Sequence, residues 1–199
     1  IGASVNIGTY YMPRLIREFQ DRYPGIKVQV KINTTAVVEK ELLDGKLDLA
    51  LVGGTIQSEH IVAEPLFYEK YTAICAPEHP MAGKTVLLEE FMKEPLLFRE
   101  KSSGAYEVFQ SAVNQTGLTV MPVWESTSQT TLMEAVHYGL GVTILPEQMI
   151  KREIREGRLA RITFSDFSFQ NTIHIAYHHS KYLSPSIKNF ILLIKTLGF

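Results

Sequence analysis

The order of local patterns in the first 54 residues is the feature that most narrows the possible folds. Apolar residues at a spacing of four predict an amphipathic helix that ends before Pro24-Gly25, and strict apolar/polar alternation after it is typical of a strand. An almost continuous apolar run before Gly53-Gly54 predicts a strand buried on both faces. The expected helix, strand, helix and strand cover residues 7–23, 26–32, 36–43 and 47–52. This order, with a first strand beginning at Ile1, indicates an open α/β sheet.

The rest of the chain continues the alternation of strand and helix patterns. Extended segments are expected at 61–67, 71–76, 96–98, 119–124, 142–145, 159–164 and 172–177, and helices at 87–92, 104–114, 128–138, 148–156 and 185–197. Ser128 is expected to cap one helix and Ser184-Pro185 to open the last. The 199 residues suffice for one large domain or two small lobes, and no Pro-, Gly- or Ser-rich linker divides them.

The net charge and the cysteine content exclude several classes of function for this chain. Lys and Arg total 20 and Asp and Glu total 21, which gives a net charge of −1. A surface that binds DNA usually carries a basic excess, so any contact with DNA is expected from another segment. Cys75 is the only cysteine, which excludes an internal disulfide and fits a reducing compartment. No apolar run approaches the length of a transmembrane helix, and the start does not resemble a signal peptide.

No pattern of catalytic or metal-binding residues stands out. His174 and His178 share a strand pattern, which places them about 13 Å apart, too far for one metal ion, whereas on a helix the two rings could meet. Cys75 lies in an apolar strand pattern and is expected to be a buried thiol. Nucleotide-binding glycine motifs and the glycine–serine elbow of hydrolases are absent from the sequence. We therefore expect no catalytic residue, no metal and no cofactor.

Four short loops rich in hydroxyl or amide side chains lead directly into expected helices. They are Ser4-Val5-Asn6, Asn33-Thr34-Thr35, Ser102-Ser103-Gly104 and Ser126-Thr127-Ser128-Gln129. Singly, each is an ordinary helix cap with free backbone N–H groups at the positive end of a helix dipole. In an open α/β sheet such helix N-termini lie along one edge, where ligands bind. Together they predict a cleft that binds a small anion or carboxylate without transforming it.

A series of motifs runs through the whole chain in a fixed order. They are Ile1-Gly2-Ala3-Ser4, Ile7-Gly8, Tyr10, Pro13, Tyr23-Pro24-Gly25-Ile26, residues 47–52, 79–84, 99–104, 135–146 and 153–159. Their order and spacing resemble those of the effector-binding domain of LysR-type transcriptional regulators. The resemblance implies a type II periplasmic-binding-protein-like α/β fold: two lobes joined by two crossover strands, with a ligand cleft between them. Lobe I would comprise residues 1–74 and 174–199, and lobe II residues 75–173.

The same resemblance implies the setting in which the domain works. It implies a cytoplasmic transcription factor whose effector domains pair as homodimers and whose full-length chains form homotetramers. Promoter DNA would be contacted only through an N-terminal winged helix-turn-helix outside this sequence. RNA polymerase is a further candidate partner, and no membrane contact is implied. Effector binding would be transmitted to the DNA-binding heads.

Position by position, the resemblance also implies which residues bind the effector. These are Ser4 and Asn6 (with Val5 between them), Thr35 (with Thr34 before it), Ser103 and Gly104 (with Ser102 before them), and Ser128. The chain departs from the family where Ala105-Tyr106 replaces a common Thr-Arg and Thr130–Met133 replaces Glu-Ala-Ile-Lys. These changes remove a hydroxyl and two cations, which leaves Arg99 as the remaining candidate cation. We therefore predict a small polar or singly charged effector that is held by neutral donors.

Two other functions fit the same fold. A solute-binding protein of a transport system would need an export signal, and an enzyme on this fold would need a nucleophile or an acid–base pair in the cleft. Cys75 is the only candidate nucleophile. The family motifs favour the regulator.

Overall fold

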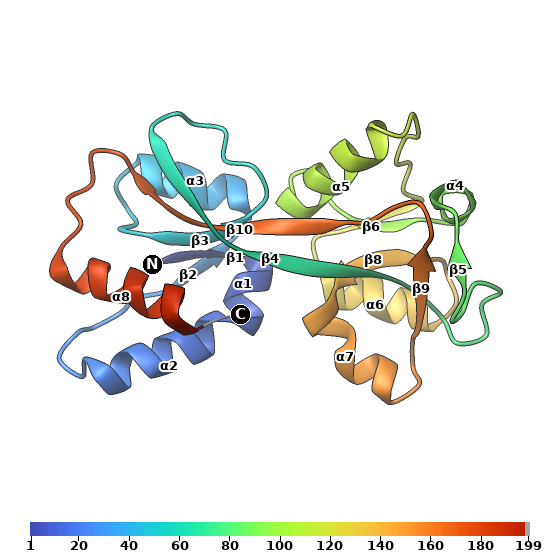
Figure 1. Cartoon of the computed structure of the whole chain (residues 1–199), viewed down its shortest axis with the longest axis horizontal. Helices are drawn as coiled ribbons and strands as arrows, with labels where there is room; N and C mark the ends of the chain where they lie inside the picture. Colours follow the sequence, from blue (N-terminus) through green and yellow to red (C-terminus); the bar gives the residue numbers. More distant parts are fainter. Residues whose placement is uncertain (198–199) are drawn as a thin grey trace. The chain divides into compact units, whose positions relative to one another are not determined.

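Two long strands, β4 (Ile61–Cys75) and β10 (Gln170–His178), run through both of the units into which the chain divides (Figure 1). The computed structural model describes residues 1–197. The first unit comprises Ile1–Tyr68 and the segment from Thr172 through the last helix, and the second unit comprises Glu69–Asn171. The boundary between the units therefore falls inside both β4 and β10.

The sheet of the first unit has the strand order β2-β1-β3-β10-β4. Its shorter strands are β1 (Gly2–Ser4), β2 (Lys31–Asn33) and β3 (Ala50–Gly53). β1 pairs in parallel with β2 and β3, whereas β10 is antiparallel to β3. The helices are α1 (Val5–Tyr10), α2 (Met12–Arg22), α3 (Thr35–Leu43) and α8 (Pro185–Leu197). Parallel strands followed by helices place the N-termini of α1 and α3 at one edge of this sheet.

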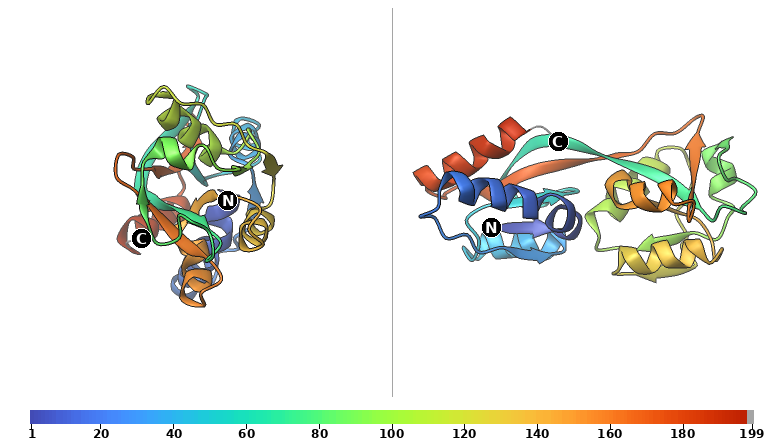
Figure 2. Two further views of the ribbon diagram at one scale, coloured as in Figure 1. Left: turned by 90° about the vertical axis from the view of Figure 1, so that its right-hand side faces the viewer. Right: turned by 90° about the horizontal axis from the view of Figure 1, so that it is seen from below.

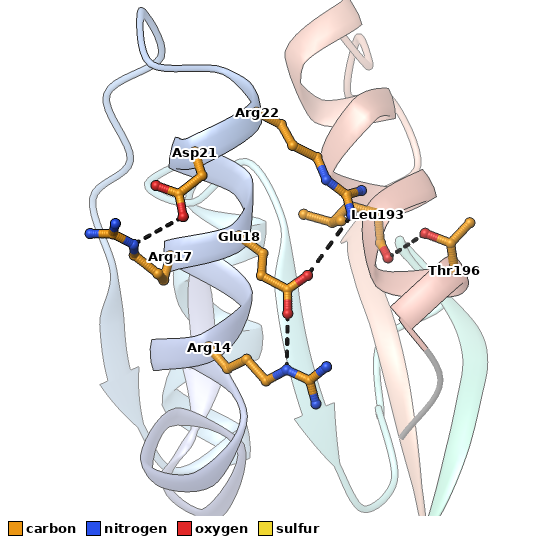
Figure 3. A network of polar contacts seen from close by, with 7 residues as sticks. All are labelled: Arg14, Arg17, Glu18, Asp21, Arg22, Leu193 and Thr196. Carbon is orange, nitrogen blue, oxygen red and sulfur yellow. Dashed lines mark hydrogen bonds and ion pairs between the residues drawn. The ribbon is translucent and has the colours of Figure 1, made fainter.

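Helices cover both faces of the first unit's sheet. Figure 2 shows α2 and α8 on one side of the strands and α3 on the other. On the α2–α8 side, Phe19 and Phe190 pack edge to face with ring centroids 5.0 Å apart. The opposite side of α2 carries Arg14, Arg17, Glu18, Asp21 and Arg22, joined by ion pairs along the helix (Figure 3). This division of apolar and charged faces is the amphipathic pattern expected from the sequence.

The second unit also has helices on two sides of its strands. Its strands are β5 (Thr85–Val86), β6 (Leu97–Arg99), β7 (Trp124–Ser126), β8 (Thr143–Pro146) and β9 (Ala160–Phe164). Its helices are α4 (Leu88–Phe91), α5 (Gly104–Asn114), α6 (Gln129–His137) and α7 (Glu147–Arg155). β8 and β9 pair with β4, and β6 pairs in parallel with β7. One apolar cluster lies under α4 and α5, and another lies under α6 and α7.

Several expectations about local structure need correction, among them the extended segment expected at 119–124, where strand β7 covers only Trp124–Ser126. The helix expected at 7–23 is broken at Tyr11, because Pro13 lacks the N–H needed to continue α1 and instead lies in the first turn of α2. The strand expected at 26–32 is reduced to β2, because its neighbour β1 begins at Gly2, which pairs with Lys31. The separate extended segments at 61–67 and 71–76 form the single strand β4.

Within residues 1–197, no helix is both long enough and apolar enough to cross a lipid bilayer.

Candidate functional site

The loops of the first unit converge on Gly53, the last residue of β3. Ser4 and Thr34 are the N-cap residues of α1 and α3, but within the described chain neither side chain caps its own helix. Instead, the backbone N–H of Gly53 donates to Ser4 Oγ at 3.3 Å, and Thr35 Oγ1 donates to the Gly53 carbonyl at 2.8 Å. The structure therefore brings the predicted residues Ser4 and Thr35 together on one glycine.

The neighbouring residues of these loops are only partly accessible. Asn6 is buried in the first turn of α1, whereas Val5 and Thr34 are half-buried. The backbone N–H of Thr34 donates to Asn33 Oδ1 at 2.9 Å, so the Asn33 side chain bonds to the backbone of its own loop. Ser4, Val5 and Thr34 thus provide the accessible surface of this group.

Strand register adds His174 to the first unit's group of loops. The pairs Gly2–Ala50 and Ala3–Leu51 place Ser4 beside Val52, and Val52 pairs with His174 on the other side. Ser4, Val52 and His174 therefore form a row across β1, β3 and β10. The His174 ring is half-buried, its Nδ1 has no partner among residues 1–197, and burial lowers its pKa. In the sequence, this histidine stands out only as a possible metal ligand.

Of the residues of the second unit that are predicted to bind the effector, some are buried and others are exposed. Ser103 is the N-cap of α5 and is buried together with Gly104, whereas Ser102 and Ser128 are exposed. Ser128 Oγ accepts a hydrogen bond from the Thr131 N–H at 3.2 Å, so this hydroxyl is the helix cap expected from the sequence.

Arg99 is not a free cation. Its guanidinium donates from Nε and Nη2 to the two carboxylate oxygens of Glu100, both at 2.8 Å. Both side chains are largely buried, with 9% and 17% of their side-chain surface exposed. The neighbouring carboxylate thus neutralises the one cation that the sequence analysis retained at the site.

Polar residues that the sequence analysis did not select lie beside Arg99. The hydroxyl of Tyr71 is hydrogen-bonded to Glu69 and to Asn171, which lie on β4 and β10. Burial and the Glu69 charge raise the pKa of Tyr71 well above its usual value. Gln129 is buried at the start of α6. Glu69 and Tyr71 share a face because they are two residues apart on a strand, but no local pattern distinguishes them from other strand residues.

Two cavities have clear linings. A cavity of about 10 Å³ in the second unit is lined by Arg99, Tyr106 and Gln129 together with aromatic rings. A larger one, of about 890 Å³, lies in the first unit around residues 26–31, 42–49 and 178–190. The larger cavity adjoins the C-terminal end of α3, and none of the predicted effector-binding residues lines it. Of these two cavities, the small one is lined by Arg99 and therefore adjoins the predicted residues of the second unit.

The described part of the chain holds no group of three or more His, Cys, Asp or Glu side chains placed to bind a metal ion. Cys75 is buried, and burial raises its pKa to about 11. The arrangement is one of hydroxyls, amides and backbone groups, which can bind a small polar molecule.

Solved structures share the fold of this chain. The effector-binding domain of QuiR in complex with shikimate has a TM-score of 0.87 at 19% identity, covering 99% of this chain and 94% of that one. The regulatory domain of CcmR from Synechocystis PCC6803 in complex with 2-PG has a TM-score of 0.88 at 22% identity, covering 98% and 93%. The type II periplasmic-binding-protein-like α/β fold expected from the sequence is thereby confirmed.

Curated relatives are transcriptional regulators, not enzymes or transport proteins. The uncharacterized HTH-type transcriptional regulator YeiE of Escherichia coli is 26% identical over 195 residues, covering 96% of this chain and 65% of the relative. The HTH-type transcriptional activator CmpR of Synechocystis is 29% identical over 195 residues, covering 95% and 62%. The chain thus spans less than two thirds of the length of these relatives. The family model described as LysR substrate binding domain matches residues 1–198, and the chain therefore belongs to this family.

Proposed function

We propose that this chain is the sensory part of a LysR-type transcriptional regulator and binds a small polar metabolite. The convergence of Ser4 and Thr35 on Gly53 is the observation that carries the proposal, because it places two hydroxyl side chains and two helix N-termini at one sheet edge. In the first unit the effector contacts are assigned to Ser4, Val5, Asn6, Thr34 and Thr35. In the second unit they are assigned to Arg99, Ser102, Ser103, Gly104 and Ser128.

The charges of the second unit favour an effector with at most one negative charge. Arg99 is already paired with Glu100, and Glu69 is a further buried acid close by. A compact multiply charged anion would find no unpaired cation among these groups and would lose its hydration. Hydroxyl and amide donors suit a hydroxylated or carbonyl-bearing metabolite.

The response is proposed to pass from this domain to DNA-binding heads. Effector binding would shift the population of domain conformers and thereby change the arrangement of the heads in a homodimer or homotetramer. In this proposal lobe I comprises residues 1–74 and 174–199 and lobe II residues 75–173, whereas the two units of the structure divide a few residues earlier, after Tyr68 and after Asn171. Promoter DNA is contacted by an N-terminal winged helix-turn-helix outside the printed sequence, with RNA polymerase as a further partner, in the cytoplasm.

A thermal-shift panel tests the proposal. Shikimate, 2-PG, amino-acid derivatives and aromatic acids would each be added to the wild-type chain. A ligand at about 100 times its dissociation constant stabilises by about 2.7 kcal/mol, which is a rise of about 5–11 °C for a chain of this size. A neutral-donor site predicts that the rise persists when salt is added.

The matched control uses a hydroxyl far from the loops. Thr35→Ala is expected to abolish the ligand-induced rise, whereas Thr196→Ala is expected to retain it. Thr196 Oγ1 donates to the Leu193 carbonyl at 2.9 Å on α8 (Figure 3), so both variants lose a hydroxyl bonded to a backbone carbonyl. A rise of equal size in both variants, or no rise with any compound of the panel, contradicts the proposal.

A further inference from the structure

The hydroxyl of Tyr106 is a buried donor without an acceptor. Tyr106 lies in the first turn of α5, is 2% exposed, and its hydroxyl has no hydrogen-bond partner among residues 1–197. Burial raises its pKa, and the charge of Glu125 adds to this effect, so the phenol stays protonated. A buried donor that has lost its water partners costs free energy, and native proteins rarely keep one without use.

Tyr106 forms part of the wall of the small cavity in the second unit. The cavity measures about 10 Å³, which is about the space for one water-sized group. Besides Tyr106, its polar walls are Arg99 and Gln129, which are 8% and 9% exposed, and Tyr71, whose hydroxyl is already bonded to Glu69 and Asn171. Its apolar walls include Phe98, which packs edge to face on the Tyr106 ring at 6.1 Å. The cavity is therefore small, and hydrogen-bond donors form part of its wall.

The charges of the cavity wall determine which oxygen-bearing group of a ligand can enter the cavity. The Arg99 charge is compensated by Glu100, so the polar walls carry no net charge. A carboxylate in this cavity would bury a charge that no unpaired cation of the cavity wall balances. A hydroxyl or a carbonyl brings one neutral oxygen that can accept the Tyr106 proton.

We propose that this cavity is the subsite of the effector site that selects a neutral oxygen. A hydroxyl or carbonyl oxygen of the ligand enters it and accepts a hydrogen bond from Tyr106, while Arg99 and Gln129 line the same space. The subsite rests on the proposed function, since it assumes that the ligand bound by the loops reaches this cavity.

The first test needs no ligand. Tyr106→Phe removes a hydroxyl that has no partner, so the melting temperature is expected to stay the same or rise. Tyr177→Phe is the matched control, because the Tyr177 hydroxyl donates to Glu64 at 2.7 Å. Its melting temperature is expected to fall by about 3 °C or more. An equal fall in Tyr106→Phe means that the hydroxyl has a permanent partner in the folded protein, and this overturns the proposal.

A further variant tests whether Glu125 is a permanent hydrogen-bond acceptor of the Tyr106 hydroxyl. Glu125 lies close enough for its charge to affect the Tyr106 pKa. Glu125→Gln is expected to leave the effect of Tyr106→Phe on the melting temperature unchanged. If the double variant shows that the two changes are coupled, the carboxylate is the natural acceptor and the cavity is not a ligand subsite.

The second test uses acetamide and acetate, which have the same shape but differ in charge. Acetamide is expected to shift the side-chain amide NMR signal of Gln129, and acetate at the same concentration is not. Tyr106→Phe should weaken the acetamide response by about five- to tenfold, whereas Tyr177→Phe should not change it. Equal responses to both probes, no response to either, or an unchanged response in Tyr106→Phe each overturn the subsite.

The two proposals fail in different ways. A metabolite that binds with Thr35-dependent affinity but is indifferent to Tyr106→Phe removes the subsite and leaves the proposed function. Acetamide binding that depends on Tyr106, with no metabolite response in the panel, supports the subsite chemistry and contradicts the proposed function.

Discussion

Thr35 donates its hydroxyl hydrogen to the carbonyl oxygen of Gly53 at 2.8 Å, which ties the first residue of α3 to the last residue of β3. The same glycine donates its N–H to Ser4 Oγ at the end of β1. The N-cap side chain of Ser4 and the first side chain of α3, Thr35, here hold the edge of the sheet together. Neither Ser4 nor Thr34 caps its own helix through its side chain, so helix dipole and loop hydroxyls lie together at this edge.

Removing the Thr35 hydroxyl should cost stability. Thr35→Val keeps the shape of the side chain but leaves the Gly53 carbonyl without its partner, so we expect a loss of about 1–2 kcal/mol in the free energy of unfolding. Urea denaturation measures the loss, and Thr35→Ser, which keeps the hydroxyl, should recover most of it. Equal stability of Thr35→Val and the wild type would show that the bond contributes nothing.

The burial of His174 should make stability depend on pH. Burial lowers the pKa of this histidine below 6.5, so the folded protein binds its proton less readily than the unfolded chain does. The free energy of unfolding should therefore fall as the pH drops from about 6.5 towards the folded-state pKa, and be unaffected by this group above pH 7.5. His174→Gln should flatten this part of the profile in urea denaturation at pH 5–8. An unchanged slope in the variant would exclude His174 as its source.

Breaking the Arg99–Glu100 pair should be costly because both side chains are largely buried. Glu100→Gln leaves the guanidinium without its counter-charge, and we expect a loss of about 3 kcal/mol in the free energy of unfolding. Glu89→Gln is the control, since the Lys93–Glu89 pair is exposed on both sides and should contribute nothing measurable. Similar small effects of both variants in urea denaturation would show that the Arg99 charge is well solvated.

The Cys75 thiol should be unreactive in the folded protein. Burial raises its pKa to about 11, so about a thousandth of it is thiolate at pH 8, and the side chain is inaccessible. We expect iodoacetamide to modify it only at the rate at which the protein unfolds. Mass spectrometry with and without urea measures this, and rapid labelling of the native protein would contradict the buried position.

Several elements could be predicted from a few neighbouring residues. The Ser128 cap and the helix α6 that follows it form as expected, because the cap hydrogen bond joins residues three apart. β3 was expected from its apolar run, and α8 from Ser184-Pro185 at its start. The loops that lead into helices could be found in the same way, since each is a short local pattern.

The tertiary structure decided what these loops contact. Gly53 joins Ser4 and Thr35 across 49 and 18 residues of sequence, and His174 reaches the same row only through the register of β10. The contacts of Tyr71 with Asn171 likewise depend on which strands pair. Periodicity and caps are set by hydrogen bonds and burial within one or two turns, so the sequence determined the elements and their polar ends. Strand pairing and the burial of polar groups depend on residues far apart in the chain, so only the folded structure determined which of these groups meet.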